Sequence, residues 1–154
     1  MDAARVVAEG HTPYRPPVIT LDDVDRDATV LADPTRIGQV LRNLLCNAAK
    51  FSPADMPISL RIAPAGTGRV RFEVTDKGPG VHPDDVPRIF EKFWRGRNGN
   101  GSGEEIAGGG IGLYVSRRIV RAHGSDISVR SMPGSGSVFG FELDLVQEHA
   151  LQGM

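Results

Sequence analysis

The chain has one cysteine, no long apolar run and no excess of positive charge. Cys46 is the only cysteine among 154 residues, which excludes a disulfide within one chain and a cysteine-based zinc site. No stretch approaches the roughly 20 apolar residues of a membrane span, and the N-terminus lacks the apolar core of a signal peptide. With 18 basic and 19 acidic residues, we expect no nucleic-acid partner and no direct membrane contact in this segment. A cytoplasmic location fits these absences best.

Glycine, by contrast, is abundant and unevenly placed. The 19 glycines follow no Gly-X-Y period, so a collagen-like chain is excluded. A hydrophobic content of 40% is ordinary for a folded domain and argues against bulk disorder. Seven of the glycines fall between Gly96 and Gly110. A stretch so poor in apolar residues predicts a flexible loop, and we expect function there.

Length and hydrophobic pattern predict one α/β domain. We interpret residues 1–16 as an irregular lead-in or linker, 17–147 as the folded domain and 148–154 as a tail. Several predicted strands follow one another without a helix between them, so the sheet must contain antiparallel pairs. The predicted extended segments are Val18–Leu21, Thr29–Ala32, Ile58–Ala63, Arg69–Asp76, Ile127–Ser131 and Ser137–Val146.

Three helices are predicted from apolar residues at helical spacing and from capping signals. Asp33 and Pro34 suit the N-cap and first position of a helix that ends near Phe51. A second helix is expected over Pro83–Trp94, and a third over Ile111–His123.

The first helix carries a polar stripe separate from its apolar stripe. At about 100° per residue, four polar side chains fall within about 40° of the Asn43 direction: Gln39, Asn43, Asn47 and Lys50. Carboxamide oxygens are neutral hard ligands suited to Mg²⁺, and a lysine one turn on can neutralise a phosphate. The stripe therefore fits a metal and phosphate site, while a solvated polar face explains the stripe alone more simply.

Asp76 ends a predicted strand on the apolar side. It shares the parity of Val70, Phe72 and Val74, so strict alternation aims a carboxylate toward the core. An unpaired charge is costly there, and a ligand with N–H donors, such as the exocyclic amine of adenine, would compensate. Gly78 in the following loop would let the backbone pass close to a flat base. A simple turn after a strand is the alternative interpretation.

A glycine-rich motif directly precedes the third helix. Gly108, Gly110 and Gly112 free backbone N–H groups to face phosphate oxygens at a helix N-terminus. The motif is not the Rossmann fingerprint, because Leu113 stands where a third glycine is needed. It is not a P-loop either, since no Gly-Lys-Ser/Thr follows. Taken alone, it fits a flexible hinge equally well.

The order and spacing of these motifs together are more specific than any single motif. Asn-x3-Asn-x2-Lys is followed by D-x-G-x-G, a Phe-rich segment ending at Arg95, G-x-G-x-G-L, and Gly134-Ser-Gly-Ser137. Over about residues 18–146, this order resembles the N, G1, F, G2 and G3 boxes of the ATP-binding catalytic domain of sensor histidine kinases. The resemblance implies the Bergerat (GHKL) fold. We then expect a two-layer α/β (α+β) sandwich, in which a mixed, largely antiparallel sheet of about five strands packs on three helices beside a flexible ATP lid.

The resemblance also implies roles on the phosphate side of the site, with ATP and Mg²⁺ as cofactors. Asn47 would ligate Mg²⁺, and Asn43 would support the metal and the phosphates. Lys50 would contact phosphate oxygens, and Arg95 would approach the γ-phosphate when the lid closes. Asn43, Lys50 and Arg95 are therefore the expected catalytic residues. The residues implied to line the phosphate channel are Gly108, Gly110, Gly112 and Leu113.

On the base side, the resemblance implies that Asp76 accepts a hydrogen bond from the adenine amine. Gly78 and Gly80 would shape the base pocket, Phe51 would flank the nucleotide, and Ser137 would lie near the adenine.

The phosphoacceptor that this family uses is not evident in the chain. None of the four histidines precedes a long amphipathic helix pair, and His123, beside Gly124, suits a structural role at a helix end. We therefore expect transfer of the γ-phosphoryl group to a histidine on a separate dimerisation domain of the same kinase. A response regulator would act downstream. The isolated domain should be a monomer, and its parent kinase could be membrane-anchored.

Two alternatives stay open. Related ATPases and anti-sigma-type serine kinases usually place a glutamate where this chain has Asn43, and an amide cannot take a proton at neutral pH. Asn43 therefore favours a histidine kinase over a serine kinase of the anti-sigma type. The other alternative is a nucleotide-binding regulatory module that transfers no phosphoryl group.

Overall fold

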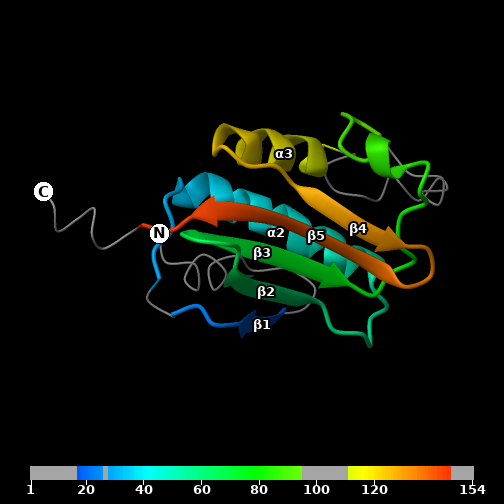
Figure 1. The fold of residues 1–154 in the computed structure, drawn as a ribbon. Helices are drawn as coiled ribbons and strands as arrows, with labels where there is room; N and C mark the ends of the chain where they lie inside the picture. The colour runs from blue at the N-terminus through cyan, green and yellow to red at the C-terminus, as the bar shows by residue number, and fades with distance from the viewer. Residues whose placement is uncertain (1–16, 26–27, 95–110, 147–154) are drawn as a thin grey trace, which may run out of the picture.

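The computed structural model describes residues 17–25, 28–94 and 111–146. Figure 1 shows the elements that they form. In chain order these are β1 (Val18–Leu21), α2 (Pro34–Phe51), β2 (Ser59–Pro64), β3 (Arg69–Asp76), the short 3-10 helix η1 (Val86–Arg88), α3 (Gly112–Ala122), β4 (Ser128–Met132) and β5 (Gly136–Asp144).

The five strands form one mixed sheet in the order β1-β2-β3-β5-β4. β1 runs parallel to β2, whereas the other three pairs are antiparallel. In the central pair, Phe72 lies opposite Phe141 and Asp76 lies opposite Ser137. The end of β3 therefore meets the start of β5, which brings two sequence-distant motifs together at one end of the sheet.

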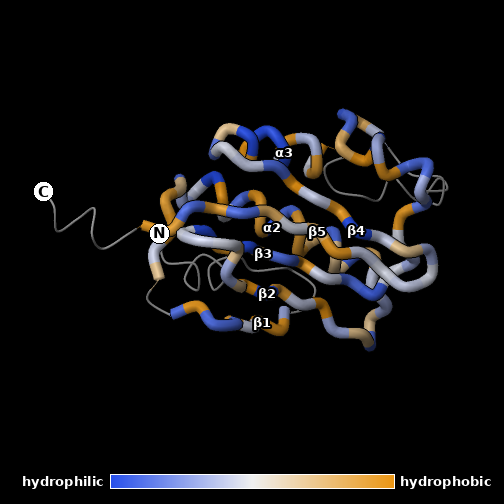
Figure 2. The backbone as a smooth tube through the Cα atoms, in the orientation of Figure 1, coloured by the Kyte–Doolittle hydropathy of each residue, from blue (hydrophilic) through white to orange (hydrophobic). Residues whose placement is uncertain are grey.

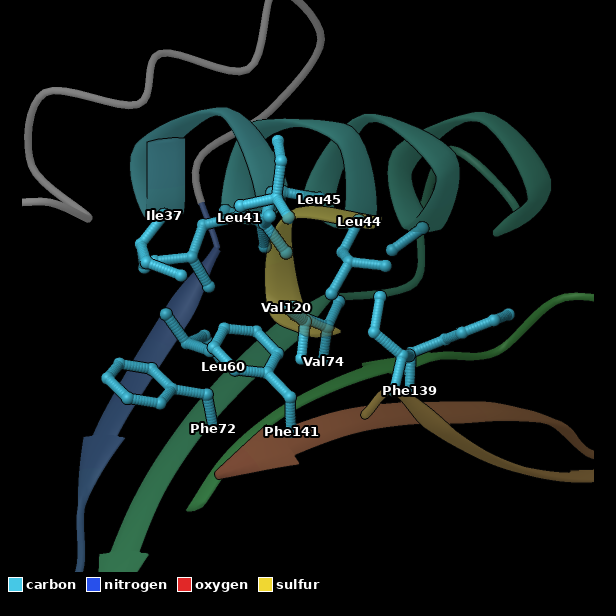
Figure 3. Packing of buried hydrophobic residues seen from close by; sticks show 14 of the residues in the cluster. Ile37, Leu41, Leu44, Leu45, Leu60, Phe72, Val74, Val120, Phe139 and Phe141 are labelled. Atoms are coloured by element: carbon cyan, nitrogen blue, oxygen red, sulfur yellow. The ribbon is translucent and has the colours of Figure 1, made fainter. Parts of the chain in front are cut away.

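The helices cover one face of this sheet. Figure 3 shows Ile37, Leu41 and Leu44 of α2 pointing toward the sheet, with Val120 of α3 in the same apolar layer. On β3 every second residue is buried, as expected for a strand with one covered face. The rings of Phe72 and Phe141 stack with their centroids 5.1 Å apart. The fold is thus the expected two-layer sandwich.

The other face of the sheet is polar. Figure 2 shows hydrophilic and hydrophobic residues alternating along the strands. Arg71 on β3 pairs with Glu73 and Glu142, and Arg69 pairs with Glu142 and Asp144. The core therefore lies entirely on the helical side.

Local signals set the N-terminal end of α2, and a contact from α3 supports it. The Asp33 side chain accepts hydrogen bonds from the backbone N–H groups of Thr35 and Arg36, and Pro34 begins the helix. The His123 Nε2 atom also accepts from the Asp33 N–H at 3.1 Å. Its Nδ1 atom lies 2.8 Å from the Ile119 carbonyl oxygen. The predicted structural role of His123 is confirmed, because its ring links the end of α3 to the start of α2.

Most predicted elements are confirmed, several with their predicted bounds. β1, α2 and β3 begin and end where the pattern predicts, and β2 and β4 are each displaced by one residue. β5 begins one residue early and ends at Asp144. The extended segment expected at 29–32 is reduced to an isolated bridge between Val30 and Leu145.

The helix predicted over Pro83–Trp94 is wrong. The structure has only one 3-10 turn there, Val86–Arg88, flanked by further turns. Pro87 has no N–H to donate to the carbonyl four residues back, so an α-helix through this position would lose that hydrogen bond. Ile89 and Phe90 nevertheless reach the core. The described residues therefore contain two α-helices instead of the expected three, and neither is long and apolar enough to cross a bilayer.

Candidate functional site

Asp76 is the buried acidic group at the end of β3. Its exposed fraction is 6%, which confirms that strand alternation aims the carboxylate inward. The Gly78 N–H donates to Oδ1 at 2.9 Å. Burial raises the pKa of the Asp76 carboxyl, while backbone hydrogen bonds from Gly78 and Ser137 and the charge of Lys77 act in the opposite direction. The result is a desolvated acceptor at this end of the sheet.

Glycines around Asp76 are required by close backbone packing. A Cβ atom at Gly78 would lie 2.7 Å from the Phe51 carbonyl oxygen, and one at Gly136 would overlap the Asp76 carbonyl. Gly80 has φ +78°, and a Cβ there would lie 2.5 Å from the Met132 carbonyl oxygen. The loop after β3 is therefore packed between the end of α2 and the β4–β5 turn. These contacts place Phe51, which is 48% exposed, beside the Asp76 loop.

Two serines that the sequence interpretation missed hold the same loop. The buried Ser52 hydroxyl accepts from the Lys77 N–H at 2.9 Å. Ser131 Oγ accepts from the Val81 N–H at 2.5 Å and shares a hydrogen bond with Ser137 Oγ at 2.9 Å. In the sequence, Ser52 indicates only the end of a helix, and Ser131 indicates only part of a strand. No local pattern could have found their roles, because both depend on tertiary contacts.

The polar stripe of α2 lies between this loop and α3. Asn43 donates from Nδ2 to the Gly112 carbonyl oxygen at 3.3 Å and to Ser116 Oγ at 3.1 Å. Asn47 is half-buried, and Lys50 is exposed near the end of the helix. Partial burial lowers the pKa of Lys50, and the nearby Cys46 acts against that change. Asn43 is thus tied to α3, whereas Lys50, near the end of α2, is exposed.

Gly112 and Leu113 form the first turn of α3. Ile111 precedes them and caps the helix without a side-chain hydrogen bond. Among the described residues, no side chain accepts from the first N–H groups of α3, and such N–H groups favour anions. A Cβ at Gly112 would make ordinary contact with Asn43, 3.7 Å from its Cγ atom. Crowding by atoms of the described residues therefore does not require a glycine at this position.

The structure brings together most of the predicted site residues, in two groups. Phe51, Asp76, Gly78, Gly80 and Ser137 gather around the end of β3. Asn43, Asn47 and Lys50 lie on α2, and Asn43 bonds Gly112, which precedes Leu113 at the N-terminus of α3. Arg95, Gly108 and Gly110, together with the loop expected to be flexible, lie outside the described residues.

The sheet is open and mixed, and the helices lie on one of its faces. A buried aspartate ends one strand, and a polar helix stripe lies beside it. These features together define the Bergerat class of ATP-binding domains. A family model described as histidine kinase-, DNA gyrase B-, and HSP90-like ATPase matches residues 32–147. The chain belongs to this family. Within it, the chain corresponds to the catalytic ATPase domain of sensor histidine kinases.

Three known proteins illustrate the similarity. The adaptive-response sensory kinase SasA of Trichormus variabilis is 43% identical over 122 residues, which are 79% of this chain and 29% of SasA. The catalytic domain of histidine kinase ThkA has a TM-score of 0.75 at 26% identity. The match covers 94% of this chain and 93% of the ThkA chain. Full-length ShkA in complex with AMPPNP has a TM-score of 0.72 at 34% identity, over 93% of this chain and 29% of its own. The chain thus spans under a third of the curated relatives that it matches.

Proposed function

We propose that the chain binds Mg-ATP and transfers its γ-phosphoryl group to a histidine on the dimerisation domain of the same kinase. The observation that carries the proposal is the buried Asp76 carboxylate at the end of β3. A desolvated acceptor there suits the exocyclic amine of adenine. The similar ShkA chain was solved with AMPPNP, which supports an adenine nucleotide in this chain as well.

The proposed pocket places the adenine against the loop after β3 and the phosphates between α2 and α3. Gly78 and Gly80 would shape the base pocket, Ser137 would lie near the base and Phe51 would flank the nucleotide. On the phosphate side, Lys50 would contact phosphate oxygens, and the Leu113 N–H at the start of α3 would line the channel. Gly108, Gly110 and Gly112 would line the same channel, and Arg95 would approach the γ-phosphate when the lid closes.

The donor set fits a metal that arrives with the nucleotide. Among the described residues, no group of three or more His, Cys, Asp or Glu side chains could hold a metal ion. Mg²⁺ usually keeps several waters and uses one or two protein ligands plus substrate phosphates. Asn47 on α2 would supply such a ligand. Bound there, Mg²⁺ would neutralise charge on the phosphates.

The transfer step would rest on positioning. Phosphoryl transfer needs little covalent help from a protein and relies on alignment and charge neutralisation. Asn43 cannot accept a proton as a general base would, so the domain should hydrolyse ATP poorly without its acceptor. In the proposed reaction, the bond from the γ-phosphorus to the bridging oxygen breaks. A bond to the histidine nitrogen forms, ADP leaves, and the nitrogen loses its proton.

The proposal extends to partners and location. The phosphohistidine would pass its phosphoryl group to a response regulator, and the domain of residues 17–147 would be a monomer when isolated. Because the reaction draws on cellular ATP, the proposal places this domain in the cytoplasm.

Titration with a fluorescent ATP analogue, with and without Mg²⁺, tests the base assignment. Asp76→Asn should lower the affinity about tenfold to a hundredfold. The Gly78 N–H would hold the oxygen of the new amide and leave its NH₂ group facing the adenine amine. Asp144→Asn is the matched control, because Asp144 is an exposed carboxylate at the opposite end of the β3–β5 pair. Equal affinity of Asp76→Asn and the wild type would contradict the adenine assignment.

A further inference from the structure

The Asn43 amide is held by α3. Its Nδ2 atom donates to the Gly112 carbonyl oxygen at 3.3 Å and to Ser116 Oγ at 3.1 Å. Ser116 lies one turn after Gly112 on α3 and has no exposed surface. A buried hydroxyl at this point is unusual for a helix face that otherwise contributes Ile119 and Val120 to the core. The hydrogen bond with Asn43 accounts for the buried Ser116 hydroxyl.

These two contacts fix which way the amide faces. A primary amide has two N–H donors on its nitrogen and lone pairs only on its oxygen. Both contacts of Asn43 to α3 are made by the nitrogen. A rotation that exchanged nitrogen and oxygen would set Oδ1 against the Gly112 carbonyl oxygen, so that two acceptors would face each other. The held orientation keeps Oδ1 away from α3, and no group in the described part of the chain bonds it.

We propose that Ser116 is a positioning residue for the nucleotide site, acting through Asn43. Its hydroxyl, with the Gly112 carbonyl, directs the Asn43 oxygen toward the phosphates and metal of bound Mg-ATP. The same hydrogen bonds tie the N-terminal turn of α3 to the helix that carries Asn47 and Lys50. The inference rests on the proposed function, and it concerns only the phosphate side of that site.

The variant Ser116→Ala separates the phosphate side from the base side. It should lower the affinity for the fluorescent ATP analogue with Mg²⁺ about fivefold, the fold-change that corresponds to one net hydrogen bond. Competition by adenosine, which carries no phosphate, should be unchanged. Ser125→Ala is the matched control, because Ser125 follows the far end of α3 and bonds the Glu142 N–H. An unchanged affinity for the Mg²⁺-bound analogue would overturn the proposal.

A double-mutant cycle tests whether Ser116 acts through Asn43. In an Asn43→Ala background, Ser116→Ala should have no further effect on affinity, because the amide that it orients is gone. An equal loss in both backgrounds would overturn the proposal, since it would reflect a general packing defect. Ser116→Cys keeps the shape of the side chain with a weak acceptor, so it should repeat the loss if Ser116→Ala does not fold.

The outcomes also separate this inference from the proposed function. Suppose that the wild type binds the analogue, that Asp76→Asn weakens this binding and that Ser116→Ala does not. Only the proposed role of Ser116 then fails. If the wild type binds no adenine nucleotide, the proposed function fails as well.

Discussion

Asp76 is a buried carboxyl group whose ionisation bears on both binding and stability. Its pKa lies above the ordinary value of 3.8, chiefly because of burial. The folded state therefore holds this proton more tightly than the unfolded state does. The resulting stabilisation is fully present below about pH 3.8 and is lost as the pH rises through the raised pKa.

Asp76→Asn should therefore gain stability relative to the wild type as the pH rises from about 4 toward 7. The amide carries no charge that burial could penalise, so the variant lacks the loss that the wild type suffers. Urea denaturation of both proteins across this range measures the difference. A difference that stays constant with pH would contradict a raised pKa at Asp76.

Gly136 illustrates a position where both conformation and space require glycine. Its φ is +100°, and a Cβ there would overlap the Asp76 carbonyl group. Gly136→Ala should destabilise the domain by about 2 kcal/mol or more. Gly134 is the control, because its φ is +82° and no atom lies within 4 Å of its added Cβ. Gly134→Ala should cost about 1 kcal/mol by denaturant unfolding, and an equal cost at both positions would contradict the close contact.

At the scale of elements, α3 is fixed at one end by ion pairs. Asp126, just before β4, accepts from Arg117 at 3.0 Å and from Arg121 at 3.2 Å. The hydrogen bond with Arg117 contributes most to lowering the pKa of Asp126 to about 2. A lowered pKa means that the stabilisation is present above about pH 3.8 and is lost as the pH falls toward 2.

Asp126→Asn should therefore destabilise the domain at pH 7 and lose this effect near pH 2. Because the side chain is about half exposed, solvent screening limits the cost to about 0.5–1 kcal/mol. Denaturant unfolding at both pH values measures it. An equal cost at both values would attribute the effect to packing instead of charge.

Helices and strands were predictable where nearby residues set their bounds. The Asp33 cap and the alternation along β3 are local, and the bounds of α2 and β3 followed from them. The apolar spacing of residues 83–94 predicts a helix, but Pro87 lacks the N–H that an α-helix needs at that position.

The features of the candidate site also divide into those with a local sequence signal and those without one. The burial of Asp76 was readable from strand parity. Gly78 and Gly80 are expected from the sequence to let the backbone pass close to a flat base. The close approaches that the structure shows at both glycines are to protein backbone. The contacts of Ser52, Ser116 and Ser131 join segments 25–73 residues apart, so no local signal could reveal them.

At the scale of the whole molecule, the proposed reaction needs a second domain. The chain incubated with radiolabelled ATP should acquire no stable phosphate, because the family's acceptor histidine is expected on a separate domain. Addition of a histidine-bearing dimerisation domain should give acid-labile label on that domain. Strong labelling of the isolated chain, or of a serine target, would contradict the proposal.

The ion pairs on the uncovered face of the sheet have a consequence for behaviour in a crowded solution. Arg69, Arg71, Glu73 and Glu142 satisfy one another in water, and the bare backbone at Gly140 makes room for the Arg71 guanidinium. A second sheet stacking on this face would have to strip water from the whole set at once. Stacking of two copies through the part of this face that the described residues form would therefore be disfavoured.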